Sequence, residues 1–226
     1  ADASGVLSKG YEGITYAADH GSKVINCSWG STFGTQLGQD VVNYAGFNKN
    51  ALVVAGAGND GLQQDFFPAS LANVISVAST NTIDRKSSFS NYGYNVDVCA
   101  PGDQVYSTWV LDYGGYLTSS GTSMSSPGVC GAAAIVKAYY PSYNALQIGE
   151  VLKATADFID YTAGNNVWAG KLGKGRINLF RALTETNMKS VVITETTITD
   201  GNDNAFVIGD TLNFVGTFTN YLNPLV

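Results

Sequence analysis

The fold is decided by the stretch Ala51-Leu52-Val53-Val54-Ala55-Gly56-Ala57-Gly58, an apolar run that ends in two glycines. A short apolar run bounded by turn-forming residues is typical of a strand that is buried on both faces. Similar runs lie at residues 24–27, 74–78 and 96–100, and apolar residues at helical spacing precede this one at 41–45. Buried strands interleaved with helices predict an α/β fold, in which helices cover both faces of a parallel sheet.

The chain is predicted to contain two domains. Further helices are expected at residues 9–19, 123–139, 145–154 and 177–183, so the α/β domain takes in residues 1–186. From residue 187 to residue 226 the sequence is rich in Val, Ile, Thr and Phe with turn-forming residues between, as in an antiparallel sheet. A whole sandwich needs about 100 residues, so this segment is predicted to be the first strands of a β-sandwich-like accessory domain.

The composition excludes several classes of protein. The 226 residues carry 12 Lys and Arg against 18 Asp and Glu, a net charge of −6, so no nucleic-acid partner is expected. No apolar run reaches the roughly 18 residues that span a bilayer. Only 13% of residues are charged, which indicates a secreted or extracellular protein. The three cysteines, Cys27, Cys99 and Cys130, cannot form a complete disulfide framework, and their apolar neighbours predict buried thiols.

The sequence contains the glycine pattern of a nucleotide-binding motif, but the residues that follow it do not fit such a site. Residues 56–61 fit the pattern G-x-G-x-x-G, and Asp84 lies at a suitable distance beyond them. The motif requires a helix to open at its third glycine, because the helix N-terminus binds the pyrophosphate. Here Pro68 and a lack of helical periodicity follow instead. A glycine-rich turn is the better interpretation of these residues.

Ser123 lies at the start of the predicted helix 123–139, within Gly121-Thr122-Ser123-Met124-Ser125-Ser126-Pro127. Free backbone N–H groups and the positive end of the helix dipole lie there. A serine in this place is either a helix cap or a nucleophile. The nucleophile motif of α/β-hydrolases does not fit, since it needs Gly at position 125.

Several segments together resemble the subtilisin-like serine proteases. Residues 121–127 are similar to the family's nucleophile motif, 53–61 to the segment with its oxyanion-hole asparagine, and 24–30 to its substrate-binding strand. Residues 89–93, 97–102 and 173–178 match further landmarks of the family in the same order. The resemblance covers about residues 5 to 185. It implies that residues 1–186 are the C-terminal portion of a subtilisin-like peptidase domain.

The resemblance also implies roles for particular residues. Ser123 would be the nucleophile that forms an acyl-enzyme, and its N–H would hold the oxyanion together with the side chain of Asn59. Extended peptide would lie between two segments as an added strand. The residues expected to bind substrate are Ser28, Trp29, Gly30, Ala55, Gly56, Ala57 and Gly58. Trp29 fits an aromatic-lined subsite and a place in the core about equally well.

The sequence differs from the family's pattern at the general base. In this family Asp and His precede the serine by about 190 and 160 residues, which places both before residue 1. The chain's one histidine, His20, ends a helix and is interpreted as a surface residue. Gly128 stands where most relatives have His, outside the triad. Three carboxylates near strand ends are interpreted as turn and cap residues: Asp84, Asp97 and Asp103.

Two hypotheses follow. In the first, the chain belongs to a secreted serine endopeptidase and is inactive alone because it lacks the catalytic Asp and His. The alternative is a catalytically dead scaffold that binds peptides. Expected partners are a polypeptide substrate and the missing N-terminal segment, or a second copy at the apolar edge of strand 24–27. No cofactor is expected. Calcium is common in the family, but Asp200, Asn202 and Asn204 resemble only the start of a calcium loop.

Overall fold

A four-stranded parallel sheet forms the centre of the protein. The structure is a computed structural model and describes residues 8–199 and 213–222. The strands are β1 (Val24–Cys27), β2 (Leu52–Gly56), β3 (Val74–Thr80) and β4 (Val98–Pro101), and they neighbour one another in that order. Val24 lies opposite Leu52, and Val77 lies opposite Val98. The predicted α/β fold with a parallel sheet is therefore confirmed.

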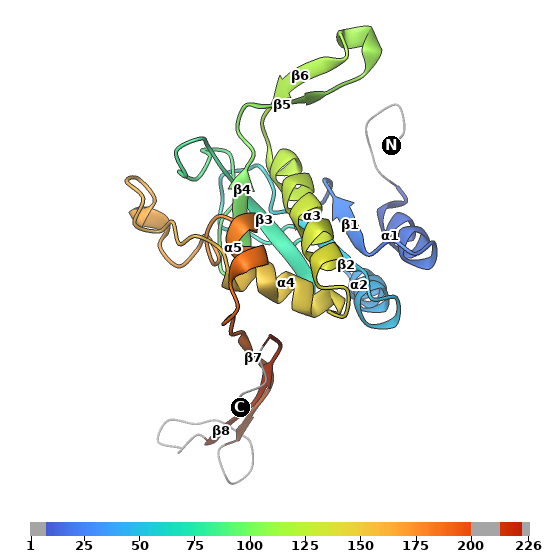
Figure 1. Cartoon of the computed structure of the whole chain (residues 1–226), viewed down its shortest axis with the longest axis vertical. Coiled ribbons are helices and arrows are strands. Elements are labelled where there is room, and N and C mark those ends of the chain that lie inside the picture. Colours follow the sequence, from blue (N-terminus) through green and yellow to red (C-terminus); the bar gives the residue numbers. More distant parts are fainter. Residues whose placement is uncertain (1–7, 200–212, 223–226) are drawn as a thin grey trace. The chain divides into compact units, whose positions relative to one another are not determined.

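Helices pack on both faces of this sheet (Figure 1). They are α1 (Gly10–Asp19), α2 (Gln36–Asn43) with a π-helical continuation at Tyr44–Asn48, α3 (Thr122–Tyr139), α4 (Ala145–Ala154) and α5 (Leu179–Thr184), with short 3-10 turns at Leu111–Tyr113 and Asn166–Trp168. Helix α3 contacts all four strands. The helix that carries Ser123 is thus fixed across the whole sheet.

Successive side chains along each strand point to opposite faces of the sheet, so both faces carry packed side chains. Ile25 and Val53 are buried with Ile14 of α1 and Val42 of α2. The face of α3 that is buried consists largely of small apolar residues. They are Val129, Ala132, Ala133 and Val136. Small side chains let the helix backbone approach the sheet closely, which brings the start of α3 to the carboxyl ends of β1 and β2.

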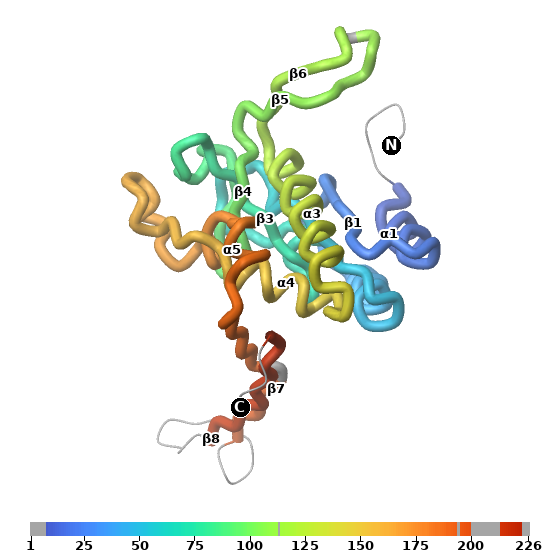
Figure 2. The backbone as a smooth tube through the Cα atoms, viewed as in Figure 1, coloured from blue at the N-terminus to red at the C-terminus, as the bar shows by residue number. Residues whose placement is uncertain are grey.

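A β-hairpin extends from the sheet just before α3 (Figures 1 and 2). It consists of β5 (Val105–Thr108) and β6 (Tyr116–Ser119), which pair in antiparallel register. The rings of Tyr106 and Tyr116 stack on its surface with centroids 5.5 Å apart. The sequence patterns did not predict this hairpin, because most of its side chains are exposed and show no buried periodicity.

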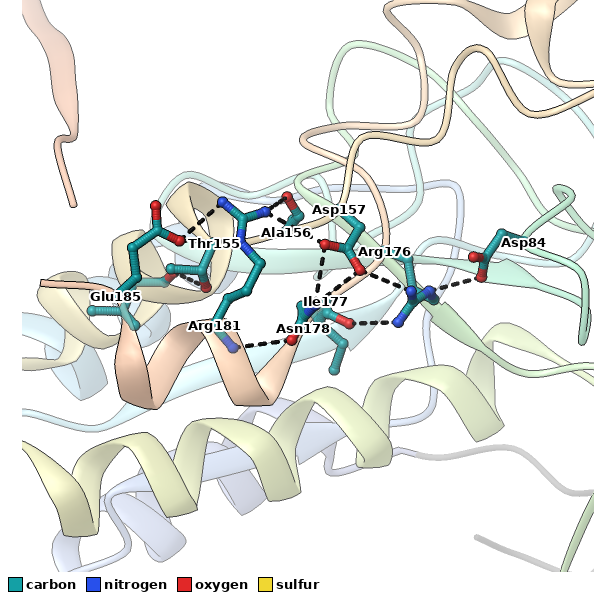
Figure 3. A network of polar contacts seen from close by, with 10 residues as sticks. Asp84, Thr155, Ala156, Asp157, Arg176, Ile177, Asn178, Arg181 and Glu185 are labelled. Carbon is teal, nitrogen blue, oxygen red and sulfur yellow. Dashed lines mark hydrogen bonds and ion pairs between the residues drawn. The ribbon is translucent and has the colours of Figure 1, made fainter. Parts of the chain in front are cut away.

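Helix α5 is attached to the domain by a network of ion pairs (Figure 3). Arg176 Nε lies 2.7 Å from Asp84 Oδ1, and Arg176 Nη2 lies 2.8 Å from Asp157 Oδ2. Asp157 also accepts hydrogen bonds from Asn178, and Arg181 pairs with it at 3.4 Å. The network therefore joins the loop after β3, the loop after α4 and the start of α5.

The chain divides into two compact units, Ala1–Glu185 and Thr186–Val226. In the second unit, β7 (Val191–Thr199) and β8 (Asn213–Asn220) form an antiparallel pair. Apolar side chains on both strands are exposed, among them Ile198 and Phe218. That this unit opens a β-sandwich-like domain remains a prediction. Asp200, Asn202 and Asn204 lie outside the described residues.

Candidate active site

The start of α3 and the end of β1 are joined through Ser123 and Ser28. Ser123 Oγ donates to the carbonyl oxygen of Ser28 at 3.2 Å, and Ser28 Oγ donates to the carbonyl oxygen of Ser123 at 2.8 Å. The Ser123 carbonyl is available because Pro127, four residues further along the helix, has no N–H to donate. The predicted nucleophile and the predicted substrate-binding serine are therefore brought together.

Asn59 reaches the same place from the end of β2. Its Oδ1 accepts hydrogen bonds from the backbone N–H of Thr122 at 2.8 Å and from Thr122 Oγ1 at 3.0 Å. Thr122 Oγ1 in turn accepts from the N–H of Gly58 at 3.2 Å. Because these contacts fix the amide oxygen, they also fix the direction of the Asn59 amide nitrogen, which is a donor. Sequence reasoning missed Thr122, although it precedes Ser123 in the quoted motif.

Two hydrogen-bond donors lie close together beside Gly121. A side-chain carbon added at Gly121 would lie 3.6 Å from Asn59 Nδ2 and 3.7 Å from the backbone nitrogen of Ser123, with Met124 Sδ at 3.5 Å. The Ser123 N–H belongs to the first turn of α3, where N–H groups lack a partner within the helix and the dipole is positive. Asn59 is exposed and Ser123 is half-buried. An anionic oxygen reaching this space would meet both donors, as in an oxyanion hole.

The residues after β1 border a cavity of about 640 Å³. Trp29 and Gly30 line it together with Tyr11, Leu37 and Phe67. The Trp29 ring meets the Tyr11 ring edge to face at 5.5 Å, and a side chain at Gly10 would overlap the Trp29 ring. Trp29 is half-buried, so it packs against the core and faces the cavity at once.

The segment Ala55-Gly56-Ala57-Gly58 is buried in this structure. A side chain at Gly56 would meet Thr122, and one at Gly58 would overlap the amide of Asn91. Both glycines therefore have a packing reason, which sequence reasoning did not foresee. Their contact with substrate remains a prediction.

His20 lies away from Ser123. It is exposed at the end of α1, where its Nδ1 lies 2.8 Å from the carbonyl oxygen of Tyr16 and its ring stacks on the Tyr16 ring at 3.9 Å. His20 precedes β1, whereas Ser123 contacts Ser28 at the far end of that strand. Extended residues rise by about 3.3 Å each, so β1 and its flanks separate the two by roughly 15 Å.

The other candidate carboxylates make local contacts. Asp84 pairs with Arg176, Asp97 accepts from the N–H of Ser76 at 2.9 Å, and Asp103 accepts from Ser120 Oγ at 2.8 Å. In the described part of the chain, no three His, Cys, Asp or Glu side chains gather as metal ligands would.

The three cysteines are free thiols. Cys27 and Cys99 are buried and Cys130 is half-buried. Burial raises the pKa of Cys27 and of Cys99 to about 12, with smaller contributions from neighbouring groups. A thiol with so high a pKa is a poor nucleophile at neutral pH. That Ser123 is the nucleophile remains a prediction.

Comparison with known proteins decides the family. The model of the subtilase family matches residues 2–206. This chain belongs to the subtilase family. Thermitase of Thermoactinomyces vulgaris is 45% identical over 180 residues, which cover 80% of this chain and 61% of thermitase. The thermophilic serine proteinase of Bacillus sp. (strain AK1) is 43% identical over 181 residues, which cover 80% of this chain and 42% of that protein.

Solved structures agree with this assignment. A protease from Pseudoalteromonas arctica PAMC 21717 superposes with a TM-score of 0.69 at 28% identity, over 76% of this chain and 57% of the protease. The subtilase chain thus spans less than two thirds of the length of these relatives. The nucleotide-binding interpretation of residues 56–61 is not supported, because no helix lies between β2 and β3. None of the described helices has the length and hydropathy that a bilayer crossing needs.

Proposed function

We propose that the protein containing this chain is a serine endopeptidase that cleaves peptide bonds through an acyl-enzyme on Ser123. The observation that carries the proposal is that Asn59 Nδ2 and the backbone nitrogen of Ser123 lie 3.6 Å and 3.7 Å from one point beside Gly121. When Ser123 Oγ attacks a peptide carbonyl, the carbonyl oxygen becomes negative, and these two donors stabilise it. The acyl-enzyme is then hydrolysed by water.

The general base comes, in this proposal, from a segment that these 226 residues do not contain. A serine hydroxyl needs a neighbouring base to become nucleophilic, and His20 lies at the wrong end of β1. The relatives are longer than this chain, and β1 is an edge strand of the sheet. One face of α3 is also exposed and largely apolar. It consists of Pro127, Gly128, Gly131, Ala134, Ile135, Ala138 and Tyr139.

The proposed substrate is an extended polypeptide. Ser28, which contacts Ser123, and Gly30 are both exposed, so a peptide can pair with their backbone as an added strand. Residues 55–58 lead to Asn59 and form the opposite side of the binding groove. The cavity beside Trp29 receives an apolar substrate side chain. The low content of charged residues favours an extracellular site of action.

Labelling with a fluorophosphonate probe tests the proposal, because the probe reacts only with an activated serine. We expect no labelling of this chain alone and rapid labelling of a longer natural protein that supplies Asp and His. Ser123→Ala in the longer protein is expected to abolish the label, whereas Ser120→Ala, at an exposed serine nearby, is expected to keep it. Labelling of the isolated chain at a protease-like rate would contradict the missing base.

The same preparation tests the second hypothesis, that of a peptide-binding scaffold. Gly128, in place of the family's histidine, is the observation that motivates it. If the longer protein binds extended peptides in calorimetry but neither labels nor cleaves them, the scaffold replaces the protease as the function.

A further inference from the structure

Asn91 clamps the segment that carries Asn59. It lies in the loop between β3 and β4 and is 1% exposed. We propose that Asn91 is a positioning residue, which holds the Asn59 amide where the oxyanion forms. The inference rests on the proposed function, because it assigns to Asn59 the part of an oxyanion donor.

The clamp consists of four hydrogen bonds on both sides of Asn59. Before it, the backbone N–H of Asn91 donates to the carbonyl oxygen of Gly58 at 3.0 Å, and Asn91 Nδ2 donates to that of Ala57 at 3.0 Å. After it, the N–H of Asp60 donates to Asn91 Oδ1 at 2.9 Å and the N–H of Leu62 donates at 3.2 Å. One side chain therefore fixes the backbone that enters Asn59 and the backbone that leaves it.

The backbone conformation of Gly58 and its lack of a side chain make this clamp possible. Its φ is +101°, a backbone conformation that residues with a side chain rarely adopt. A side-chain carbon at Gly58 would also overlap the Asn91 amide. The turn that presents Asn59 thus leaves room for the Asn91 amide to reach the carbonyl of Ala57.

Asn91 is itself held by a buried lysine and a buried serine. Lys86 Nζ donates to the carbonyl oxygen of Ser90 at 2.7 Å and lies 4.7 Å from the centre of the Trp168 ring. Ser90 Oγ accepts from the N–H of Ser79 at 2.8 Å and donates to the carbonyl oxygen of Asn91 at 2.9 Å. The clamp is therefore anchored to β3 and does not move freely with the Asn59 loop.

Hydrogen exchange on this chain tests the clamp without any catalysis. Asn91→Ala removes the acceptor for the N–H groups of Asp60 and Leu62, and both are expected to exchange at least about tenfold faster. Asn91→Asp keeps an acceptor oxygen and is expected to keep part of the protection. The matched control is Asn95→Ala, which removes bonds to Asp65 and Ser70 only and is expected to leave both amides unchanged.

Kinetics of the longer, active protein test the catalytic consequence. Asn91→Ala is expected to lower kcat by about 10- to 100-fold with little change in KM, because the displaced donor acts in the transition state. In an Asn59→Ala background the same change is expected to cost nothing more, since the donor that Asn91 positions is gone. Asn95→Ala is expected to leave kcat unchanged.

The outcomes separate the inference from the proposed function. Unchanged exchange at Asp60 and Leu62 in a folded Asn91→Ala variant overturns the clamp, whatever the protein catalyses. Losses in kcat that add fully to those of Asn59→Ala overturn the positioning role. If the longer protein shows no activity, the exchange measurement still decides whether the clamp exists. If Asn91→Ala does not fold, Asn91→Asp provides both measurements.

Discussion

At the residue scale, Thr122 determines which way the Asn59 amide points. Its N–H and its hydroxyl both donate to Asn59 Oδ1, which also fixes the direction of the amide nitrogen. A threonine hydroxyl can also accept, and here it accepts from the N–H of Gly58. The Thr122 side chain thereby holds both the Asn59 amide and the backbone turn at Gly58.

Replacing this hydroxyl tests its share of the oxyanion hole. In the active, longer protein, Thr122→Val is expected to lower kcat about tenfold, the equivalent of one hydrogen bond. This is less than the roughly 10²- to 10³-fold loss of kcat that follows removal of the oxyanion-hole asparagine of subtilisin. Thr122→Ser keeps the hydroxyl and is expected to stay close to the parent rate. An unchanged kcat for Thr122→Val, measured at saturating peptide substrate, would contradict this role.

Residues that a short sequence motif marks could be predicted from the sequence. Residues that matter through contacts with distant parts of the chain could not. Ser123 and Asn59 were singled out by the motifs around them, and the structure brings them together. Asn91 and Thr122 were missed because their partners lie 29 to 64 positions away in the chain. A single polar side chain carries no sign in the sequence of such distant partners.

At the element scale, buried elements were predicted better than exposed ones. The helix expected at residues 145–154 is α4 to the residue, with a capping box at Asn144 and Gln147. The strand expected at residues 96–100 begins only at Val98. The hairpin of β5 and β6 was missed because pairing between exposed strands depends on cross-strand contacts that sequence periodicity does not record.

The attachment of α5 can be tested through Asp157, which joins two arginines and Asn178 (Figure 3). Asp157→Ala is expected to lower the free energy of unfolding of this chain by about 1–3 kcal/mol, because it leaves these donors without their shared acceptor. Urea denaturation followed by tryptophan fluorescence measures the change. Glu12→Ala removes an exposed pair with Lys9 and serves as the control, with little expected effect. Equal effects of the two variants would show that the network adds nothing beyond surface charge.

At the scale of the whole molecule, the first unit has two exposed surfaces of the kind that a partner covers. The outer edge of β1 is unpaired in the described sheet, and α3, which packs against β1, has an exposed apolar face. A parallel sheet is normally covered on both faces and shielded at its edges. We therefore expect this chain to associate with itself. If the proposed N-terminal segment covers the same surface, the longer protein is expected to be monomeric.

Ile135, at 47% exposure on α3, distinguishes these two situations. Ile135→Lys is expected to reduce self-association of this chain in light scattering, because a charge interrupts the apolar face. If the proposed N-terminal segment covers this position in the longer protein, the same change is expected to destabilise that fold, because a buried charge is costly. Ile83→Lys makes the same replacement in a loop, at 58% exposure, and is expected to change neither. If the unsubstituted chain stays monomeric at high concentration, the expected self-association is wrong. If both proteins tolerate Ile135→Lys equally well, no segment covers α3. The catalytic Asp and His would then have to come from a source other than the proposed N-terminal segment.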